Sequence, residues 1–245
     1  MPTLIHELYS KYETIRKFKK IMKTKGQHKT IGLIDIGSIR NNAIIIKKFN
    51  PGSKDSIQDH SAFSLSLLSN SPANKNQGIT SNAQIIYADI TDINNAINFN
   101  LVNKALKWLI SLNTNIIVMP FGGSESHAEI SKTLAIANSL GIFVFAAAGN
   151  GYPANTYFPA RHPSVISVGS MGWDGRKLPE CCENPKPDLL FPGYLIPGCT
   201  KNNDITVRSG SSAACVLAGG IATCLITNRS IKTRNTLISK LKGGL

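Results

Sequence analysis

The apolar residues of this chain fall into short runs that alternate with longer amphipathic stretches. Five runs of β-branched or apolar residues have the length of a buried strand, at residues 30–35, 84–88, 115–119, 142–147 and 165–168. Apolar positions at helical spacing occupy residues 101–112, 125–140, 212–226 and 230–241. Buried strands separated by helices of this length predict an α/β fold, a three-layer sandwich whose central sheet is mostly parallel.

Two segments depart from this alternation. Residues 4–24 carry apolar positions at helical spacing with Lys and Arg opposite, which predicts an amphipathic helix lying on the main body or, alternatively, on a membrane surface. Residues 51–82 are rich in Ser, Asn, Gly and Pro and are predicted to be mostly loop, with a short helix at 62–68. We therefore divide the chain into a basic helical extension, residues 1–29, and a main domain, residues 30–245.

The composition is that of a globular protein. With 245 residues, 42% of them hydrophobic and 17% charged, the chain is long enough for one sizeable domain. Its apolar runs are shorter than the ~18 residues that cross a bilayer, so we expect no stable membrane insertion. The start of the chain lacks the apolar core of a secretory signal, which favours the cytoplasm, although a processed secreted form would look the same.

The formal net charge is +13, and the lysines are spread along the chain without interleaved aromatic residues. A basic surface favours anionic partners such as nucleic acid or an acidic peptide. The simpler explanation is a solvated surface in a chain that is rich in Lys, Asn and Ile.

The cysteines are predicted to be reduced thiols. Their number, five, is odd, and no signal peptide precedes them. Cys181, Cys182 and Cys199 lack both the paired CxxC spacing and a nearby histidine, so we expect no zinc site. Cys215 and Cys224 fall in an apolar tract and are expected to be small core residues.

Polar residues stand where predicted strands end and one helix begins. Asp35 closes the first strand, Asn150 follows the strand at 142–147, and Ser211 and Ser212 open the helix at 212–226. In such sheets functional groups gather at the carboxyl ends of strands and the amino ends of helices. An Asn amide can stabilise an oxyanion, and a serine at a helix start can be a nucleophile. Taken singly, each position is equally explained by a loop cap, a turn or a helix N-cap.

Taken together, these motifs resemble those of the subtilisin-like serine proteases, the subtilases of peptidase family S8. The segment 34–37, Ile-Asp-Ile-Gly, is similar to their Asp-Thr-Gly motif, and 147–150, Ala-Ala-Gly-Asn, matches their oxyanion motif. The segment 210–214, Gly-Ser-Ser-Ala-Ala, resembles Gly-Thr-Ser-Met-Ala. The resemblance covers about residues 30–227 in collinear order. It implies a subtilisin-like fold, catalytic roles for Asp35 and Ser212, and Asn150 in the oxyanion hole.

The histidine motif departs from the family pattern. Where subtilases have His-Gly-Thr-His, residues 60–63 are His-Ser-Ala-Phe, so that His60 matches the catalytic histidine and Phe63 replaces the second one. The remaining histidines, His6, His28, His127 and His162, stand outside this segment. The resemblance therefore implies a triad of Asp35, His60 and Ser212.

The same resemblance locates a substrate cleft between residues 119–123 and residues 95–100. The substrate-binding residues that it implies are Asn98, Met119, Pro120, Phe121, Gly122, Gly123, Ala148, Gly149 and Tyr157. An extended peptide would pair with the strand end by β-augmentation, although Pro120 lacks an N–H for that pairing. Tyr157 stands where the floor of the primary specificity pocket is often Gly, so we expect a small residue before the scissile bond.

These implications define an expected function. The resemblance implies a serine endopeptidase that works through an acyl-enzyme without metal or organic cofactor, and it leaves structural calcium open. We expect a peptide or protein substrate, and specifically a precursor peptide whose acidic leader complements the basic chain. One alternative is a catalytically inactive subtilase that binds peptides or scaffolds a partner. Another is a nucleic-acid-binding module, which only the charge supports, so we expect no nucleic-acid partner.

Overall fold

The computed structural model describes residues 8, 10–37, 39, 44–50, 60–69, 78–94, 97–228 and 231–243. In this part of the chain, seven strands form one parallel sheet in the order β2-β3-β1-β4-β5-β6-β7. The strands are β1 (Thr30–Asp35), β2 (Ile45–Lys48), β3 (Gln84–Asp89), β4 (Ile116–Met119), β5 (Phe143–Ala147), β6 (Val165–Met171) and β7 (Leu189–Pro192). The predicted α/β fold with a parallel central sheet is confirmed.

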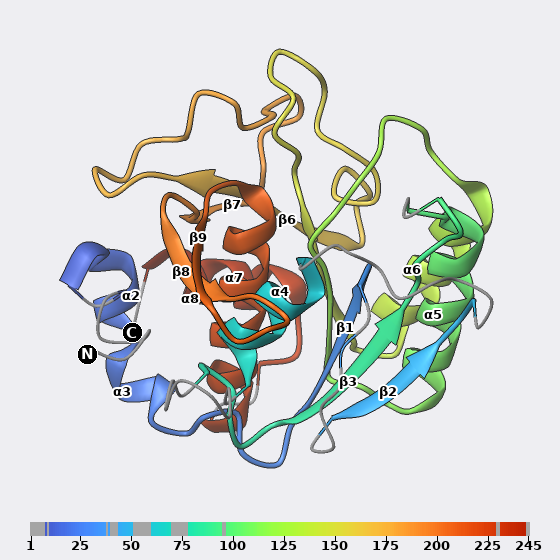
Figure 1. Cartoon of the computed structure of the whole chain (residues 1–245), viewed down its shortest axis with the longest axis horizontal. Coiled ribbons are helices and arrows are strands. Elements are labelled where there is room, and N and C mark those ends of the chain that lie inside the picture. Colours follow the sequence, from blue (N-terminus) through green and yellow to red (C-terminus); the bar gives the residue numbers. More distant parts are fainter. Residues whose placement is uncertain are drawn as a thin grey trace.

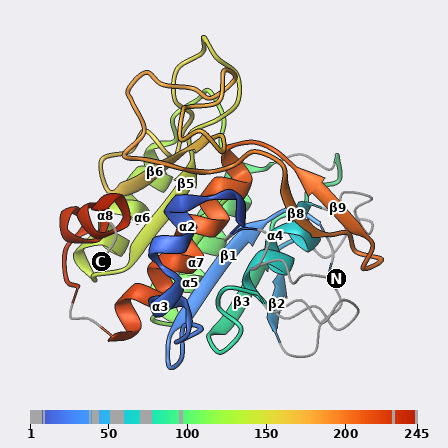
Figure 2. The same cartoon turned by 90° about the vertical axis from the view of Figure 1, so that its left-hand side faces the viewer.

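Helices cover both faces of this sheet (Figure 1). One face carries α5 (Phe99–Ser111) and α6 (Ala128–Ser139). The other carries α2 (Glu13–Lys17), α3 (Lys19–Met22), α4 (His60–Leu68), α7 (Ser211–Asn228) and α8 (Arg234–Gly243), and a view turned by 90° shows α7 lying along the strands (Figure 2). The three layers bury two hydrophobic clusters, one on each side of the sheet. This arrangement leaves the carboxyl ends of the strands open for a site.

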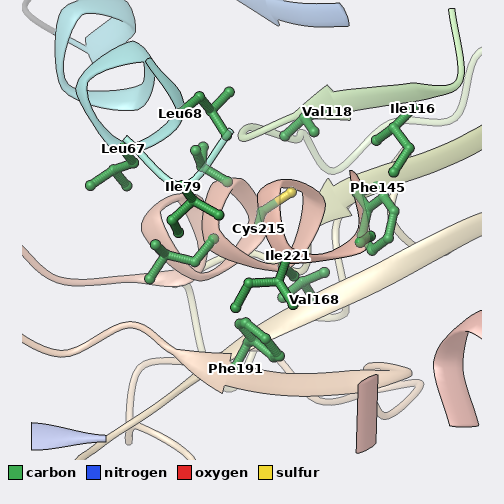
Figure 3. Close-up of a cluster of buried hydrophobic side chains, with 14 of the residues drawn as sticks. Leu67, Leu68, Ile79, Ile116, Val118, Phe145, Val168, Phe191, Cys215 and Ile221 are labelled. Atoms are coloured by element: carbon green, nitrogen blue, oxygen red, sulfur yellow. The ribbon is translucent and has the colours of Figure 1, made fainter. Parts of the chain in front are cut away.

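Helix α7 is the centre of the larger cluster. Its small and apolar residues are buried on all sides, as expected for a helix that is hydrophobic all round. Figure 3 shows Leu67 and Leu68 of α4 at the upper left of this helix, with Val118 above it, Phe145 to its right and Phe191 below it. The helix lies so close to the sheet that a Cβ on Gly219 would be only 2.4 Å from Val118 Cγ2.

The described N-terminal segment has helical residues at 8, 10 and 11, then α2 and α3, with breaks at Tyr12 and Phe18. The single helix predicted over residues 4–24 is therefore wrong in the described part; residues 1–7 and 9 lie outside it. The break between α2 and α3 lies at Phe18, which is fully buried and packs on Phe191 at a centroid distance of 6.4 Å. The Tyr12 hydroxyl donates a hydrogen bond of 2.6 Å to Tyr194 O. Tertiary packing has therefore overridden the helical periodicity, and the segment shares one core with the main domain.

Several short strands escaped the sequence pattern. β2 and β7 have four residues each, and an antiparallel hairpin of β8 (Ile196–Cys199) and β9 (Ile205–Arg208) precedes α7. Alternation is hard to recognise over four residues, and β8 contains Pro197 and Gly198, which are uncommon within strands. The short helix predicted at 62–68 begins two residues earlier, at His60. That shift places His60 in the first turn of α4.

The close approach at Gly219 can be tested by adding one methyl group. We expect Gly219→Ala to lower the free energy of unfolding by about 1–3 kcal/mol, because Val118 is stiff and the core must shift. Urea denaturation measures this loss. The substitution should cost less in a Val118→Ala background. Gly243→Ala, a helical position where a Cβ meets nothing within 4 Å, is the matched control. Equal stability of Gly219→Ala and wild type would contradict the packing described.

Candidate active site

The carboxyl ends of β1, β4 and β5 and the starts of α4 and α7 meet at one pocket of about 330 Å³. Its lining consists of Asp35, Ile36, His60, Ile97, Pro120, Phe121, Gly122, Ala147, Gly149, Asn150, Tyr157, Ser211 and Ser212. Segments far apart in the sequence thus contribute to one concave site. The three residues predicted as a triad and the predicted oxyanion residue are all among them.

Asp35 is fully buried and holds His60 by its ring nitrogen. His60 Nδ1 lies 2.7 Å from Asp35 Oδ1 and 2.9 Å from Oδ2. The carboxylate also accepts hydrogen bonds from Ile36 N, at 2.8 Å, and from Ser64 Oγ, at 2.9 Å. A buried carboxylate is costly unless it is paired and hydrogen-bonded, and these donors meet that requirement. The arrangement leaves His60 Nε2 as the ring nitrogen available for chemistry.

A second group of hydrogen bonds fixes the loop after β1, and sequence analysis missed its members. The Tyr87 hydroxyl lies 2.5 Å from Gly37 O, which also accepts from Ser61 Oγ at 2.9 Å. The Gly37 N–H donates to Thr91 Oγ1 at 2.9 Å. Burial raises the pKa of Tyr87 well above its usual value, so the phenol remains a donor. These partners come from β3, the segment after it and α4, and no local motif marks them.

The pKa of His60 is raised, chiefly by the negative charge of Asp35. Burial opposes this effect, the hydrogen bond to Asp35 adds to it, and the positive charge of Arg208 opposes it. The side chain of His60 is 26% exposed, so it can also reach a bound molecule. Asp35 therefore both orients the imidazole and stabilises its protonated form.

The two serines at the start of α7 have different partners. Ser211 Oγ accepts a hydrogen bond of 3.1 Å from Gly149 N, and Ser211 N donates one of 2.9 Å to Asn150 Oδ1. Ser211 therefore ties α7 to the loop after β5. Ser212 Oγ donates a hydrogen bond of 2.5 Å to Pro120 O, across the pocket that His60 also lines. The Ser212 hydroxyl must rotate away from Pro120 before it can meet His60.

Asn150 is oriented by its neighbours so that its amide nitrogen can act as a donor. Its Oδ1 accepts from Ser211 N, which leaves Nδ2 as the donor end. Gly210, with φ +127°, makes room for this amide, because a Cβ there would lie 2.6 Å from Asn150 Nδ2. Any other residue at 210 would meet both backbone strain and a clash.

Tyr157 fills space above three glycines. A Cβ on Gly149 would lie 2.7 Å from Tyr157 Cδ2, one on Gly151 would lie 2.5 Å from its hydroxyl, and one on Gly122 would lie 2.7 Å from its Cβ. Tyr157 N also donates to Ala148 O at 2.9 Å. The aromatic ring thus forms part of the pocket wall, and its role in substrate specificity stays a prediction.

Some of the other predicted cleft residues line the pocket and some do not. Phe121 and Gly122 line the pocket, whereas Gly123 exchanges hydrogen bonds of 2.8 Å with Phe158 beside it. Three others keep their side chains away from the pocket: Met119 and Ala148 are buried in the core, and Asn98 is the N-cap of α5, accepting from Asn100 N and Leu101 N. Ile97, which sequence analysis did not single out, lines the pocket next to that cap. A substrate role for Asn98 stays a prediction.

Three further features concern the whole described part of the chain. No helix in it is long and apolar enough to cross a membrane. Within the same residues, no group of three or more His, Cys, Asp or Glu side chains is arranged to hold a metal ion. All five cysteines lie in this part of the chain; they are buried and form no disulfide.

The chain belongs to the subtilase family, whose model matches residues 42–242. The match begins after β1, so Asp35 lies just outside the matched range and is placed by the structure through its contacts with His60.

Particular relatives share about a quarter of the aligned residues. A thermostable alkaline protease of Halalkalibacterium halodurans is 24% identical over 164 residues, which are 67% of this chain and 45% of that protein. Subtilisin E of Bacillus subtilis is 24% identical over 169 residues, or 67% and 44% of the two chains. The chain spans about half the length of the curated relatives that it matches.

Solved structures show the same fold. The prenylagaramide maturation protease PagA superposes with a TM-score of 0.74 at 20% identity, covering 86% of this chain and 79% of that one. A cold-adapted subtilisin-like serine proteinase gives 0.75 at 21% identity, with 88% and 81% covered. A mutant of the protease domain of PatA gives 0.74 at 17% identity, with 90% and 98% covered.

The electrostatic link between Asp35 and His60 predicts a measurable titration. In wild type we expect His60 to remain protonated above pH 6.5, because Asp35 raises its pKa. In Asp35→Asn the pKa should fall below 6.5, because burial then acts without the opposing charge. NMR titration of the imidazole Cε1–H signals measures both, with His60→Gln for assignment. Exposed Asp204→Asn is the matched control. An unchanged His60 titration in Asp35→Asn would contradict the pairing.

Proposed function

We propose that this protein is a serine endopeptidase in which Asp35, His60 and Ser212 form the catalytic triad. The observation that carries the proposal is the pairing of His60 Nδ1 with buried Asp35 at a pocket that Ser212 also lines. Asp35 holds the Nδ1–H tautomer, so that His60 Nε2 can act as the general base. Family membership and the protease relatives support this assignment.

The reaction follows from these positions. Ser212 Oγ leaves Pro120 O, passes its proton to His60 Nε2 and attacks the peptide carbonyl carbon. The negative oxygen of the tetrahedral intermediate accepts hydrogen bonds from Asn150 Nδ2 and Ser212 N, an interaction worth about 3 kcal/mol for one such side chain. His60 then gives the proton to the leaving amine. Water, activated by His60, attacks the acyl-enzyme, releases the acid product and restores the Ser212 hydroxyl.

The substrate that this pocket favours is an extended peptide with a small residue before the scissile bond. The strand end at 119–123 offers backbone groups to an extended peptide, except at Pro120, which has no N–H. Tyr157 packs against Gly149 and Gly122 and reduces the space for a large side chain.

We further propose that the natural substrate is a precursor peptide with an acidic leader. PagA, which shares the fold, is described as a maturation protease. The net charge of +13 would attract an acidic leader and raise its association rate at low salt. Cleavage that is indifferent to salt and to the charge of the leader would contradict this part of the proposal.

A second candidate function is peptide binding without catalysis. Two observations favour it: the Ser212 hydroxyl is bonded to Pro120 O, and the histidine motif departs from the family pattern at residues 61–63. A serine whose hydroxyl stayed in that bond would not react. The two candidates therefore differ in the nucleophilicity of Ser212.

A fluorophosphonate probe distinguishes them, because it reacts with an activated serine whatever the peptide substrate is. We expect wild-type protein to be labelled and both Ser212→Ala and His60→Ala to lose labelling by at least about a hundredfold. Exposed Ser139→Ala and His28→Ala are matched controls that should react like wild type. A folded wild type that stays unlabelled would support the binding function instead.

The role of Tyr157 predicts a change in specificity. Wild type should cleave after Ala or Gly and much less after Phe or Leu, because the ring occupies the pocket wall. Tyr157→Gly should raise kcat/KM after Phe or Leu by about tenfold or more. Peptides that differ only at that residue measure the effect, with exposed Tyr152→Ala as control. Efficient wild-type cleavage after Phe or Leu, but not after Ala, would refute the role.

A further inference from the structure

Arg208 is a partly exposed cation held beside the proposed general base. It ends β9, four residues before Ser212 in the sequence. Its guanidinium carbon lies 5.2 Å from the ring centroid of Phe63, which follows His60 by three residues on α4. Phe63 is itself fixed beneath the hairpin, since a Cβ on Gly198 would lie 2.5 Å from its ring. Residues three apart share a helix face, so Arg208 and His60 are on the same side of α4.

The charge of Arg208 has no carboxylate partner among the residues that the structure describes, none of which forms an ion pair with it. Its positive charge instead acts on His60, where it opposes protonation. The proposed catalytic carboxylate, Asp35, already forms hydrogen bonds with His60, Ser64 and Ile36. Arg208 is therefore held in place by an aromatic face while its N–H groups remain available to a ligand.

The chemistry of the proposed reaction says which part of a substrate passes Arg208. Gly122, Asn150 and Tyr157 line the pocket, and the acyl part of a substrate should lie against them because Asn150 is the proposed oxyanion donor. His60 must touch the leaving nitrogen in order to protonate it. Arg208 couples to His60 but is not part of the described pocket lining. The segment that leaves with the amine therefore runs past His60 toward Arg208.

We infer that Arg208 is a specificity-determining residue that binds an acidic side chain in the first two residues after the scissile bond. This inference rests on the proposed endopeptidase function and adds the chemistry of the leaving segment. A guanidinium stacked on an aromatic ring presents a planar edge of donors that matches a carboxylate bidentately. Phe63 supplies that ring at the position where the histidine motif departs from the family pattern.

Cleavage profiling tests this without knowledge of the natural substrate. A peptide mixture with Asp, Asn or Lys at either of the first two positions after each cleavable bond is digested and read by mass spectrometry. Wild type is compared with Arg208→Gln, Arg208→Glu and Arg208→Lys. Arg176→Gln is the matched control, since it removes the same charge from a side chain that is 89% exposed. Fluorophosphonate labelling of every variant runs in parallel, because that probe carries no leaving peptide.

Wild type and Arg176→Gln should cleave Asp peptides about tenfold faster than Asn peptides in kcat/KM. Arg208→Gln should reduce that ratio to about twofold or less, Arg208→Glu should favour Lys, and Arg208→Lys should keep part of the preference. A labelled wild type without acidic preference, or an Arg208→Gln that retains it, would overturn the inference and leave the proposed function standing. A lower melting temperature with an unchanged ratio would show a structural role only and would also overturn it. Absence of labelling in folded wild type would contradict both the proposed endopeptidase function and the inference on Arg208.

Discussion

The buried carboxylate of Asp35 is the constraint on which the rest of the site depends. An ion in a protein interior costs several kcal/mol unless donors surround it, so the chain must bring polar groups to the end of β1. Ile36 provides one from the next residue, and His60 and Ser64 provide the others from α4. The hydrogen bonds that stabilise the Asp35 carboxylate therefore hold α4 at the carboxyl end of β1. Because Leu67 and Leu68 of α4 pack on α7, the same charge also helps to fix the helix that carries Ser212 (Figure 3).

The geometry of the site also depends on two glycines that allow close approach to neighbouring side chains. Gly219 lets α7 lie on β4, and Gly210 gives the chain a conformation that leaves room for the Asn150 amide. Ser211 then joins α7 to the loop after β5 with two hydrogen bonds. These hydrogen bonds link the start of α7 to the loop that follows β5. The proposed nucleophile Ser212 and the proposed oxyanion donor Asn150 both lie on these linked segments.

The sequence predicted the features that depend on residues close together in the chain. Long apolar runs marked β1 and β3 to β6, because burial acts on neighbouring residues. Asp35, Asn150 and Ser212 were selected by the resemblance of their motifs to those of subtilases, since local chemistry alone was equally explained by caps and turns. The short strands β2, β7, β8 and β9 and the break at Phe18 depend on tertiary packing, and the sequence pattern did not mark them. The same is true of contacts between distant segments, such as Ser64 with Asp35 or Arg208 with Phe63. No spacing rule joins positions separated by so much chain.

The most direct test of the central claim is a crystal structure of the protein after reaction with a fluorophosphonate. We expect phosphorus bonded to Ser212 Oγ, with the hydrogen bond to Pro120 O broken. It also predicts a phosphoryl oxygen that accepts from Asn150 Nδ2 and Ser212 N, and His60 still paired with Asp35. An adduct on another residue, or a phosphoryl oxygen directed away from Asn150, would contradict the proposed catalytic geometry.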